Sequence, residues 1–367
     1  MGADLDDLGP AVLAELDPQD HAAAVALAAA RIRETGTRTA EADLTAIRED
    51  GRPRAVLVVA RGVAAIAARA WIATCGTTGP VILAVAHPDE LPAWAGPVDL
   101  VIGAAGTDDP VVAAALEQAV RRGSHVAVVA GARSSLAEVA EQGRGTVVAL
   151  PSTPPGLELW TVLPALAVMG DAASVAPSPP VTIETAATVL EELARRCHPS
   201  AESFVNPAKA LAHDLGGTAP LVWGDGAVAG VAAERFAERL AAAGVAALSG
   251  ALPAVLGTQG ALLAQPRASE PRSGDDFFRD RADDVDSTPR HLVLLPDAEV
   301  SPALSETRAL AHAGGVGVAE MIGDQGPALA RFAAHAGLAD WVGLYVALAN
   351  GRDPSLASGT DRSPLPA

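Results

Sequence analysis

The residues best suited to hold a ligand lie in three short turns, each between an apolar run and a helical segment. One turn contains Gly62, the second is Gly106-Thr107-Asp108-Asp109-Pro110, and the third contains Ser134 and Ser135. Backbone N–H groups at the start of a helix favour an anion such as phosphate, and hydroxyl groups can bind a phosphate or a sugar hydroxyl. The candidate substrate-binding residues are therefore Gly62, Thr107, Asp108, Ser134 and Ser135.

Each turn also has a simpler interpretation. Gly62 is a single glycine in a tight turn, and Ala64 supplies no hydroxyl. Asp and Ser cap helices by accepting hydrogen bonds from unpaired backbone N–H groups. Both interpretations stay open for Asp108 and Asp109, whereas capping of the helix that begins near residue 136 is favoured for Ser134 and Ser135.

Groups for acid–base catalysis are sparse. Isomerisation at a carbonyl needs a base with a pKa near neutrality, which favours His or Glu at the end of a strand. His213 and His312 lie on helical segments and are weak catalytic candidates, because surface or core positions are more typical of such histidines. The sequence contains no nucleophile elbow and no H-x-x-x-H spacing, so neither a serine hydrolase nor a zinc enzyme is supported. We expect no metal and no cofactor.

Composition excludes several classes of protein. The 367 residues include 26 Lys plus Arg against 44 Asp plus Glu, a formal net charge of −18, which argues against a nucleic-acid partner. Half of the residues are hydrophobic, so a disordered chain is excluded. The acidic start of the sequence does not resemble a signal peptide, and Cys75 and Cys197 show no metal-binding spacing, so a cytoplasmic protein is expected.

One long charge-free stretch, Leu240 to Pro266, needs a membrane check. It exceeds the roughly 20 residues that a spanning helix requires. Pro253, Gln259 and Gln265 interrupt it, and most of its residues are small. We therefore expect a buried helix and strand here, and no membrane segment.

The elements that must position the three turns are predicted from apolar runs. Runs that are apolar on both faces are typical of a parallel sheet covered by helices, and five of them occur at 55–59, 81–86, 100–102, 126–129 and 147–150. A strand, turn and helix over 220–240 repeat the pattern of 56–71. The predicted fold class is α/β, with two copies of one unit.

The repeat suggests a division of the chain into four parts. These are an N-terminal helical segment at 1–50, a first domain at 51–170, a linker helix at 171–200, and a second domain at 201–367. The second domain contains a charged loop at 265–290 and ends in a helix.

The order of these segments resembles the sugar isomerase (SIS) domain proteins, and in particular the bifunctional phosphoglucose/phosphomannose isomerase family. The similarity covers nearly the whole chain and includes packing segments such as Asn206-Pro207-Ala208-Lys209, Pro220-Leu221-Val222-Trp223-Gly224 and Gly337-Leu338-Ala339-Asp340-Trp341. It implies two SIS-like domains, each a parallel sheet flanked by helices. It also implies a homodimer and a sugar phosphate or related small molecule as ligand.

The resemblance further implies where the site residues should lie, and this chain departs from the pattern there. The family's Gly-Gly-Ser turn falls on Gly62-Val63-Ala64, and its Ser/Thr-rich phosphate loop falls near residues 104–109, where Thr107 keeps a hydroxyl. Its catalytic Glu falls on Ala242 and its catalytic His on Gly257. Because losing a general base typically lowers a rate by about 10² to 10⁴, ordinary glucose-6-phosphate/mannose-6-phosphate isomerase activity is doubtful.

Two functions remain open. In the first, the chain isomerises a sugar phosphate with other groups, which predicts that His213 or His312 converges on Thr107 and Gly62. In the second, it is a non-catalytic regulatory or partner-binding relative of these isomerases, which predicts an apolar cleft lined by Leu240 to Pro266. The second is slightly preferred.

Overall fold

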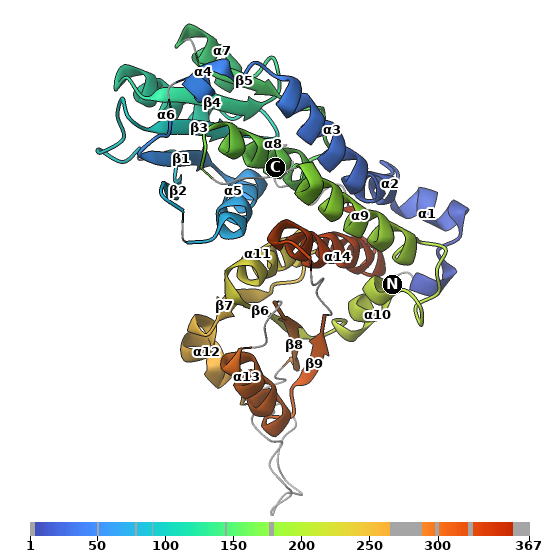
Figure 1. Ribbon diagram of the computed structural model, residues 1–367. Coiled ribbons are helices and arrows are strands. Elements are labelled where there is room, and N and C mark those ends of the chain that lie inside the picture. The colour runs from blue at the N-terminus through green and yellow to red at the C-terminus, as the bar shows by residue number, and fades with distance from the viewer. Residues whose placement is uncertain are drawn as a thin grey trace, which may run out of the picture.

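The computed structural model describes residues 4–49, 51–77, 79–89, 91–143, 145–175, 180–264, 288–297, 301–321 and 326–354. The predicted charged loop at 265–290 lies outside the described residues except at its end. The chain forms two parallel sheets with helices around and between them (Figure 1). This confirms the predicted α/β class with parallel sheets flanked by helices.

The first sheet has five strands in the order β2-β1-β3-β4-β5, and every pair of neighbours is parallel. The strands are β1 (Ala55–Ala60), β2 (Ile82–Ala86), β3 (Leu100–Ala104), β4 (His125–Ala130) and β5 (Thr146–Ala149). Each predicted apolar run became a strand. The central strands β1, β3 and β4 are buried on both faces, as expected of such runs, whereas the edge strands β2 and β5 are partly exposed.

Alternate side chains of this sheet enter two different cores. Val56 and Val58 pack with one set of helices, and Leu57 and Val59 pack with the other. On the first face lie α5 (Gly62–Cys75) and α8 (Leu159–Ala172). On the second face lie α6 (Pro110–Arg121) and α7 (Ser135–Gln142). The period of two along each strand therefore explains why no polar residue interrupts the runs.

The second sheet repeats this arrangement with four parallel strands in the order β7-β6-β8-β9. The strands are β6 (Ala219–Asp225), β7 (Leu248–Leu252), β8 (Arg290–Leu295) and β9 (Gly317–Glu320). Its helices are α11 (Gly226–Ala242), α12 (Ala254–Gln259), the short 3-10 helix η2 (Gly260–Leu263) and α13 (Pro302–Ala313). The strand and helix predicted over 220–240 are joined without a separate turn, because β6 continues to Asp225 and α11 begins directly at Gly226.

A layer of helices joins the two sheets. Its centre is α14 (Ala328–Ala349), which packs on α11, on α9 (Pro180–Arg196) and on α10 (Pro207–Asp214). In Figure 1 the red helix α14 lies between the first sheet above and the second sheet below. By length and composition α14 could cross a membrane, but most of it is buried inside the protein, as in the core helix of a globular fold.

The N-terminal region is more divided than expected. It contains η1 (Leu5–Asp7), α1 (Pro10–Leu16), α2 (His21–Ala26), α3 (Ala28–Glu41) and α4 (Thr45–Glu49). The predicted N-terminal helical segment at 1–50 is therefore a series of short helices and not one continuous helix. The chain leaves helical geometry at Leu27, where ψ is 2°, and at Ala42, where ψ is 155°.

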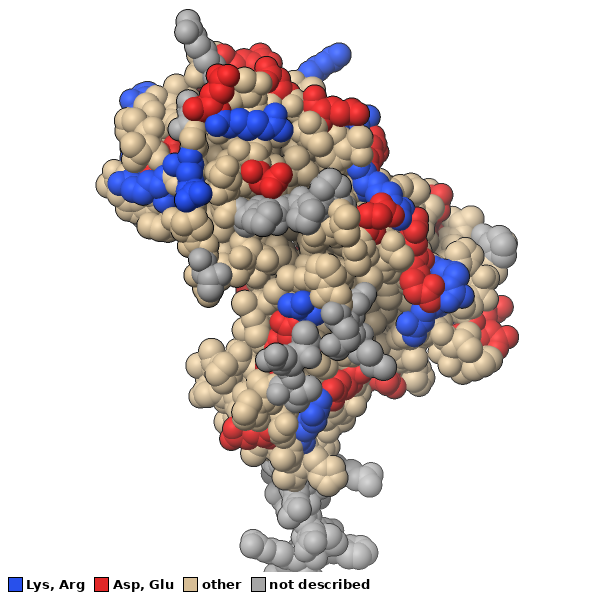
Figure 2. All heavy atoms as spheres, viewed as in Figure 1, with Lys and Arg blue, Asp and Glu red and all other residues tan. Residues whose placement is uncertain are grey.

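Acidic and basic side chains are interspersed on the surface. On the face drawn in Figure 2, red and blue side chains alternate over the first sheet and along the helix layer. Several of them form ion pairs, such as Arg33 with Glu184 and Arg195 with Glu192. No broad basic area is present among the described residues on this face.

Candidate functional site

The strand order of the first sheet reverses direction between β1 and β3. The chain moves outward from β1 to the edge strand β2 and then crosses to β3, from which it continues to β4 and β5. Ligands of open parallel sheets bind at the carboxyl ends of the two strands where the order reverses. We call this place the switch point, and the loops after β1 and β3 contain Gly62, Thr107 and Asp108.

Gly62 begins α5 in a backbone conformation that favours glycine. Its φ is +53°, in the left-handed region. A Cβ at this position would meet no atom within 4 Å, so the backbone angle and not crowding selects the residue. Among the described residues no side chain caps α5, so its first N–H groups are open to another partner.

Arg61 and Asp109 connect the two loops of the switch point. Arg61 Nε and Nη2 donate to the two carboxylate oxygens of Asp109, each at 2.8 Å. The same carboxylate caps α6 by accepting from the N–H groups of Val111 at 3.1 Å and Val112 at 3.2 Å. This bonding raises the pKa of Arg61 above its ordinary value. The positive charge of Arg61 is therefore already paired with a carboxylate of the same chain.

Asp108 extends the connection to the loop after β4. Its Oδ1 accepts from the backbone N–H of Ser135 at 2.8 Å and from the Ser135 hydroxyl at 2.6 Å, and these bonds lower the pKa of Asp108. Ser134 is buried and caps α7 by accepting from Ala137 N–H at 3.2 Å. Its hydroxyl donates to the carbonyl of Gly131 at 2.8 Å.

The structure thus brings the predicted site residues together along one edge of the sheet. Gly62 begins α5, Ser135 begins α7, and Asp108 lies in the loop before α6. These three junctions of strand and helix are linked by the bonds above, and Thr107 is exposed between Gly106 and Asp108. The capping interpretation is confirmed for Asp109 and Ser134. Asp108 does not cap α6 but binds the start of α7. A ligand-binding role for these residues stays a prediction.

Glu158 packs against the loop after β3, and the sequence pattern did not point to it. It directly precedes α8, is 8% exposed, and lies against Gly106 in the loop after β3. A Cβ on Gly106 would lie 2.0 Å from Cγ of Glu158, so only glycine fits there. Oε2 of Glu158 is buried without a hydrogen-bond partner among the described residues. Burial raises the pKa of this carboxyl above its ordinary value.

A signal for Glu158 was present in the sequence. It is the only charged residue between Gly156 and Gly170, in a run that otherwise reads as a buried helix. A single acidic residue in such a run either lies exposed at the end of the helix or is buried for a functional reason, because burying a carboxylate without a partner costs free energy. The contact with Gly106 shows that Glu158 is buried. Gly106 lies 52 positions earlier, so the sequence pattern around Glu158 does not indicate this contact.

A buried ion network lies behind Glu158, where the two halves meet. Arg235 of α11 donates to Asp340 of α14 at 2.5 Å, to the carbonyl of Gly156 at 2.7 Å and to Glu238 at 2.5 Å. Trp160 Nε1 donates to the second oxygen of Asp340 at 2.7 Å. The network therefore fixes the start of α8, and with it Glu158, to helices of the second half.

The positions that the resemblance assigns to catalysis carry no titratable side chain. Ala242 is the last residue of α11, and Gly257 lies in α12, where a Cβ would meet no atom within 4 Å. His213 and His312 are exposed on α10 and α13, which pack around the second sheet. The structure does not bring either histidine to Thr107 and Gly62 within one chain (Figure 1).

The second sheet has its own reversal of strand order, between β6 and β8. Asp225 ends β6 and accepts from the N–H of Ser301 at 2.9 Å and from its hydroxyl at 2.6 Å. Asp297 follows β8 and binds Arg331. A cavity lies at the amino ends of the strands of the second sheet, opposite to Asp225 and Asp297. Residues 244–246 from the stretch Leu240 to Pro266 line it, together with polar groups such as Asn350. That cavity is not the apolar cleft that the second functional interpretation predicted.

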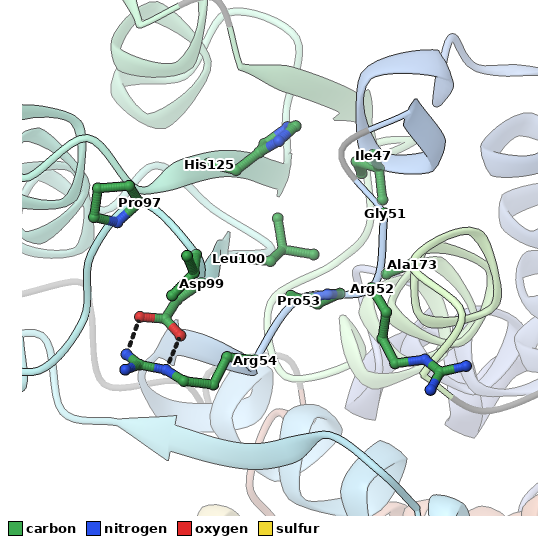
Figure 3. A pocket seen from close by; sticks show the side chains of 11 residues that line it. Ile47, Gly51, Arg52, Pro53, Arg54, Pro97, Asp99, Leu100, His125 and Ala173 are labelled. Atoms are coloured by element: carbon green, nitrogen blue, oxygen red, sulfur yellow. Dashed lines mark hydrogen bonds and ion pairs between the residues drawn. The ribbon is translucent and has the colours of Figure 1, made fainter.

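A cavity of about 480 Å³ lies at the amino ends of the first sheet (Figure 3). Its charged groups include Arg54 and Asp99, which are joined by two hydrogen bonds of 2.9 and 2.6 Å. Asp99 also accepts from Gly96 N–H at 2.9 Å, so this carboxylate fastens the turn before β3 to the start of β1. Because it lies away from the carboxyl ends of the strands, this cavity is a weaker candidate than the switch point.

Metal binding has no support in the part of the chain that the structure describes. No group of three or more His, Cys, Asp or Glu side chains there is arranged to hold a metal ion. Cys75 and Cys197 are unpaired, and burial raises the pKa of Cys75 to about 11 and that of Cys197 to about 12. Neither thiol is therefore a reactive thiolate near neutral pH.

Comparison with known proteins gives a consistent picture. Residues 204–362 match the family described as the bacterial phospho-glucose isomerase C-terminal SIS domain. No curated protein gives a significant match.

Solved structures share the fold over most of the chain. One, provisionally assigned as a tagatose-6-phosphate ketose/aldose isomerase from Clostridium novyi, has a TM-score of 0.64 and 11% identity, covering 99% of this chain and 97% of that chain. The C-terminal domain of glucosamine-fructose-6-phosphate aminotransferase from Francisella tularensis has a TM-score of 0.63 and 10% identity, covering 90% and 96%. At these identities the similarity establishes the fold alone. Residues 204–362 are therefore similar to the C-terminal SIS domain of bacterial phospho-glucose isomerases, and the chain as a whole has the fold of these SIS-domain structures.

Proposed function

We propose that this protein binds a carbohydrate derivative, a sugar phosphate or related molecule, at the switch point of the first sheet, without ordinary glucose-6-phosphate/mannose-6-phosphate isomerase activity. The observation that carries the proposal is the gathering of Thr107, Asp108 and Ser135 at the carboxyl ends of parallel strands. Carboxylates and hydroxyls at this place are suited to the hydroxyl groups of a sugar.

The absence of acid–base groups at Ala242 and Gly257 supports the second half of the proposal. Aldose–ketose isomerisation moves a proton between neighbouring carbons, which requires a group that can accept and return it. Neither residue has such a group, and the exposed His213 and His312 belong to helices around the other sheet. Binding is therefore favoured over turnover.

Thermal shift and a coupled isomerase assay test both halves of the proposal. The ligands are glucose, fructose and mannose 6-phosphates, each beside its unphosphorylated sugar. A ligand at 100 times its Kd stabilises the folded state by about 2.7 kcal/mol, which is a measurable shift. A shift with at least one sugar and no turnover supports the proposal. Turnover at an ordinary enzymatic rate contradicts the claim of inactivity, and no shift with any sugar contradicts binding.

A regulatory or partner-binding role is the second candidate function. Phe204 and Val205, which are adjacent in the loop before α10, are 83% and 57% exposed. Adjacent exposed apolar side chains can belong to a surface that a protein partner covers. If no sugar shifts the melting temperature of a folded sample, this candidate takes first place.

We also propose a homodimer in the cytoplasm, as the resemblance implies. Ile82 on the edge strand β2 and Leu248 on the edge strand β7 are 62% and 50% exposed, which supports burial of these edges in an assembly. Light scattering coupled to size-exclusion chromatography measures the mass directly. A mass of one chain over the whole concentration range contradicts the dimer.

A further inference from the structure

We propose that an apolar groove beside the N-terminal helices is the docking site of a basic amphipathic helix from another protein. The groove is lined by residues of α1, α2, α14 and the loop after α9, and we call it the N-terminal groove. The proposal gives the second candidate function a class of partner, and it does not depend on sugar binding at the switch point. The lining, the rigidity and the charge of the groove support it.

The lining of the N-terminal groove is mainly apolar. The groove has a volume of about 460 Å³, and its buried lining residues include Leu8 and Trp341, which are 6% and 2% exposed. Leu13 also lines it, and Leu27, in the same lining, is 52% exposed. Single exposed leucines are ordinary on a protein surface, but here they border a concavity. Such grooves bind the apolar face of an amphipathic helix.

Buried hydrogen bonds hold the wall of the groove that α2 provides. Asp17 is 4% exposed, and its carboxylate oxygens accept from the N–H groups of His21 and Ala22, each at 2.7 Å. These bonds fix the start of α2, whose C-cap is Leu27. The exposed leucine is therefore attached to a helix that is held in place at its beginning.

The wall at 198–200 is fixed by bonds to the body of the protein. The carbonyl of Pro199 accepts from Nζ of Lys209 at 2.8 Å. The carbonyl of Cys197, directly before this wall, accepts from the hydroxyl of Tyr345 at 2.5 Å. A groove whose walls are already ordered loses little conformational entropy when a partner binds.

The charge around the groove favours a basic partner. The first 30 residues of the chain contain six Asp or Glu residues and no Lys or Arg. Asp20 lines the groove, and Asp7 and Glu15 lie close in sequence to lining residues of the same region; all three are exposed. Glu202 adds an exposed carboxylate from the loop before α10. Lys and Arg side chains that flank an apolar helix face would pair with these carboxylates.

The same charge argues against two other occupants of the groove. A second copy of this chain would bring its own carboxylates to the groove, and like charges repel. An anionic lipid surface is repelled for the same reason. A helix with basic residues on one face and aliphatic residues on the other complements both the charge and the lining.

Fluorescence anisotropy with three labelled synthetic peptides tests the proposal on the full chain, at neutral pH and low ionic strength. The first peptide has Lys and Leu at the spacing of an amphipathic helix. The second has Glu in place of Lys, and the third has the composition of the first in a scrambled order.

Two variants test the groove, each with a matched control. Leu27→Ser removes an exposed aliphatic side chain from the groove, and Leu310→Ser removes one from α13, where Leu310 is 42% exposed. Asp20→Asn removes a charge and keeps a residue type that accepts the φ of +55° at this position. Glu141→Gln removes an exposed charge at the end of α7.

We expect the Lys/Leu helix to bind wild type about tenfold more tightly than either other peptide. Leu27→Ser should weaken this binding about tenfold, because a leucine contact is lost, and Asp20→Asn should weaken it severalfold. Leu310→Ser and Glu141→Gln should leave the affinity unchanged.

Three results overturn the proposal. The first is binding of the Glu/Leu or the scrambled peptide as tightly as the Lys/Leu helix, or no binding of any peptide. The second is an equal effect of Leu27→Ser and Leu310→Ser, which would show that the contact is not in the groove. The third is a wild-type dimer, measured by light scattering, that Leu27→Ser dissociates, because a second copy would then cover the groove. None of these results changes the thermal shift with sugars, so a failure here is distinguishable from a failure of sugar binding.

Discussion

Arg235 and Asp340 form an ion pair whose two side chains are almost completely removed from water. Nη2 of Arg235 lies 2.5 Å from Oδ1 of Asp340, and the side chains are 0% and 2% exposed. The residues are 105 positions apart, on α11 and α14. Since the carbonyl of Gly156 and the indole of Trp160 join the same pair, it connects the second half of the chain to the start of α8.

Removing the charge of Asp340 should destabilise the fold strongly. Asp340→Ala leaves Arg235, and with it the buried Arg239, without its principal anion, and breaking a buried pair in this way costs about 3–5 kcal/mol. Urea unfolding measures the loss. Glu192→Ala is the control, because its pair with Arg195 is exposed and should be worth less than about 1 kcal/mol. Equal losses in both variants would show that the network is not structural.

Replacing Gly106 should reveal its contact with Glu158. In Gly106→Ala the new Cβ would lie 2.0 Å from Cγ of Glu158, so the loop or α8 must move, at a cost of about 1–3 kcal/mol. Gly257→Ala is the control, because nothing lies within 4 Å of its Cβ. The double variant Gly106→Ala/Glu158→Ala should recover part of the loss, and strict additivity of the two single variants would contradict the contact.

Asp109 should contribute to stability through α6 as well as through Arg61. Asp109→Ala removes the cap of Val111 and Val112 N–H, which costs about 1–2 kcal/mol. Arg61→Ala removes only the partly exposed ion pair and should cost less than about 1 kcal/mol. Chemical denaturation compares the two variants. A larger loss in Arg61→Ala would show that the pair, and not the cap, is the more important interaction.

Stability should fall between pH 7 and pH 5 because of His21. Burial, reinforced by Arg239, lowers the pKa of His21 to about 4 in the folded state, against 6.5 for an ordinary histidine. Between these values the unfolded chain binds a proton that the folded chain does not, so the free energy of unfolding decreases as the pH falls. The contribution is about 2 kcal/mol at pH 5.

The variant His21→Gln isolates this effect, because Gln keeps an acceptor for the Arg239 Nη2 that lies 3.2 Å from His21 Nε2. Urea unfolding at pH 7 and pH 5 should show a smaller loss in the variant than in the wild type. His213→Gln, which changes an exposed histidine, should behave like the wild type. The same pH dependence in wild type and His21→Gln would contradict the assignment.

Most of the first sheet could be predicted because its strands are short apolar runs, and the central ones are buried on both sides. The run 55–59 became β1 with one additional residue, and 126–129 became the interior of β4. The strand β9 gave no such signal, since Gly317, Val318 and Glu320 are exposed and the run has four residues. The edge strands β2 and β5 still contain apolar runs, whereas the short edge strand β9 does not, so it could not be recognised in this way.

The loops of the candidate site could be predicted from the sequence, but the buried residues that pack behind them could not. Gly62, Thr107 and Asp108 follow strands in sequence, so the order of strand, turn and helix is enough to place them. Glu158 enters the site through a contact with Gly106, and Asp340 approaches Arg235 from a helix more than a hundred residues later. Such contacts depend on how elements distant in the sequence pack together, and the hydrophobic periodicity of each segment does not indicate this.

Asp340 lies late in the sequence, on α14, and this has a consequence for folding during translation. At about 5 to 20 residues per second, a ribosome that has just added Arg235 needs roughly 5 to 20 s to reach Asp340, 105 residues later. During that interval the guanidinium has to stay hydrated, and α11 has no α14 to pack against. The two halves therefore pack together only after α14 has been translated. A nascent chain that stalls before this helix exposes the surface of α11 that α14 would cover, and chaperones and proteases can bind there.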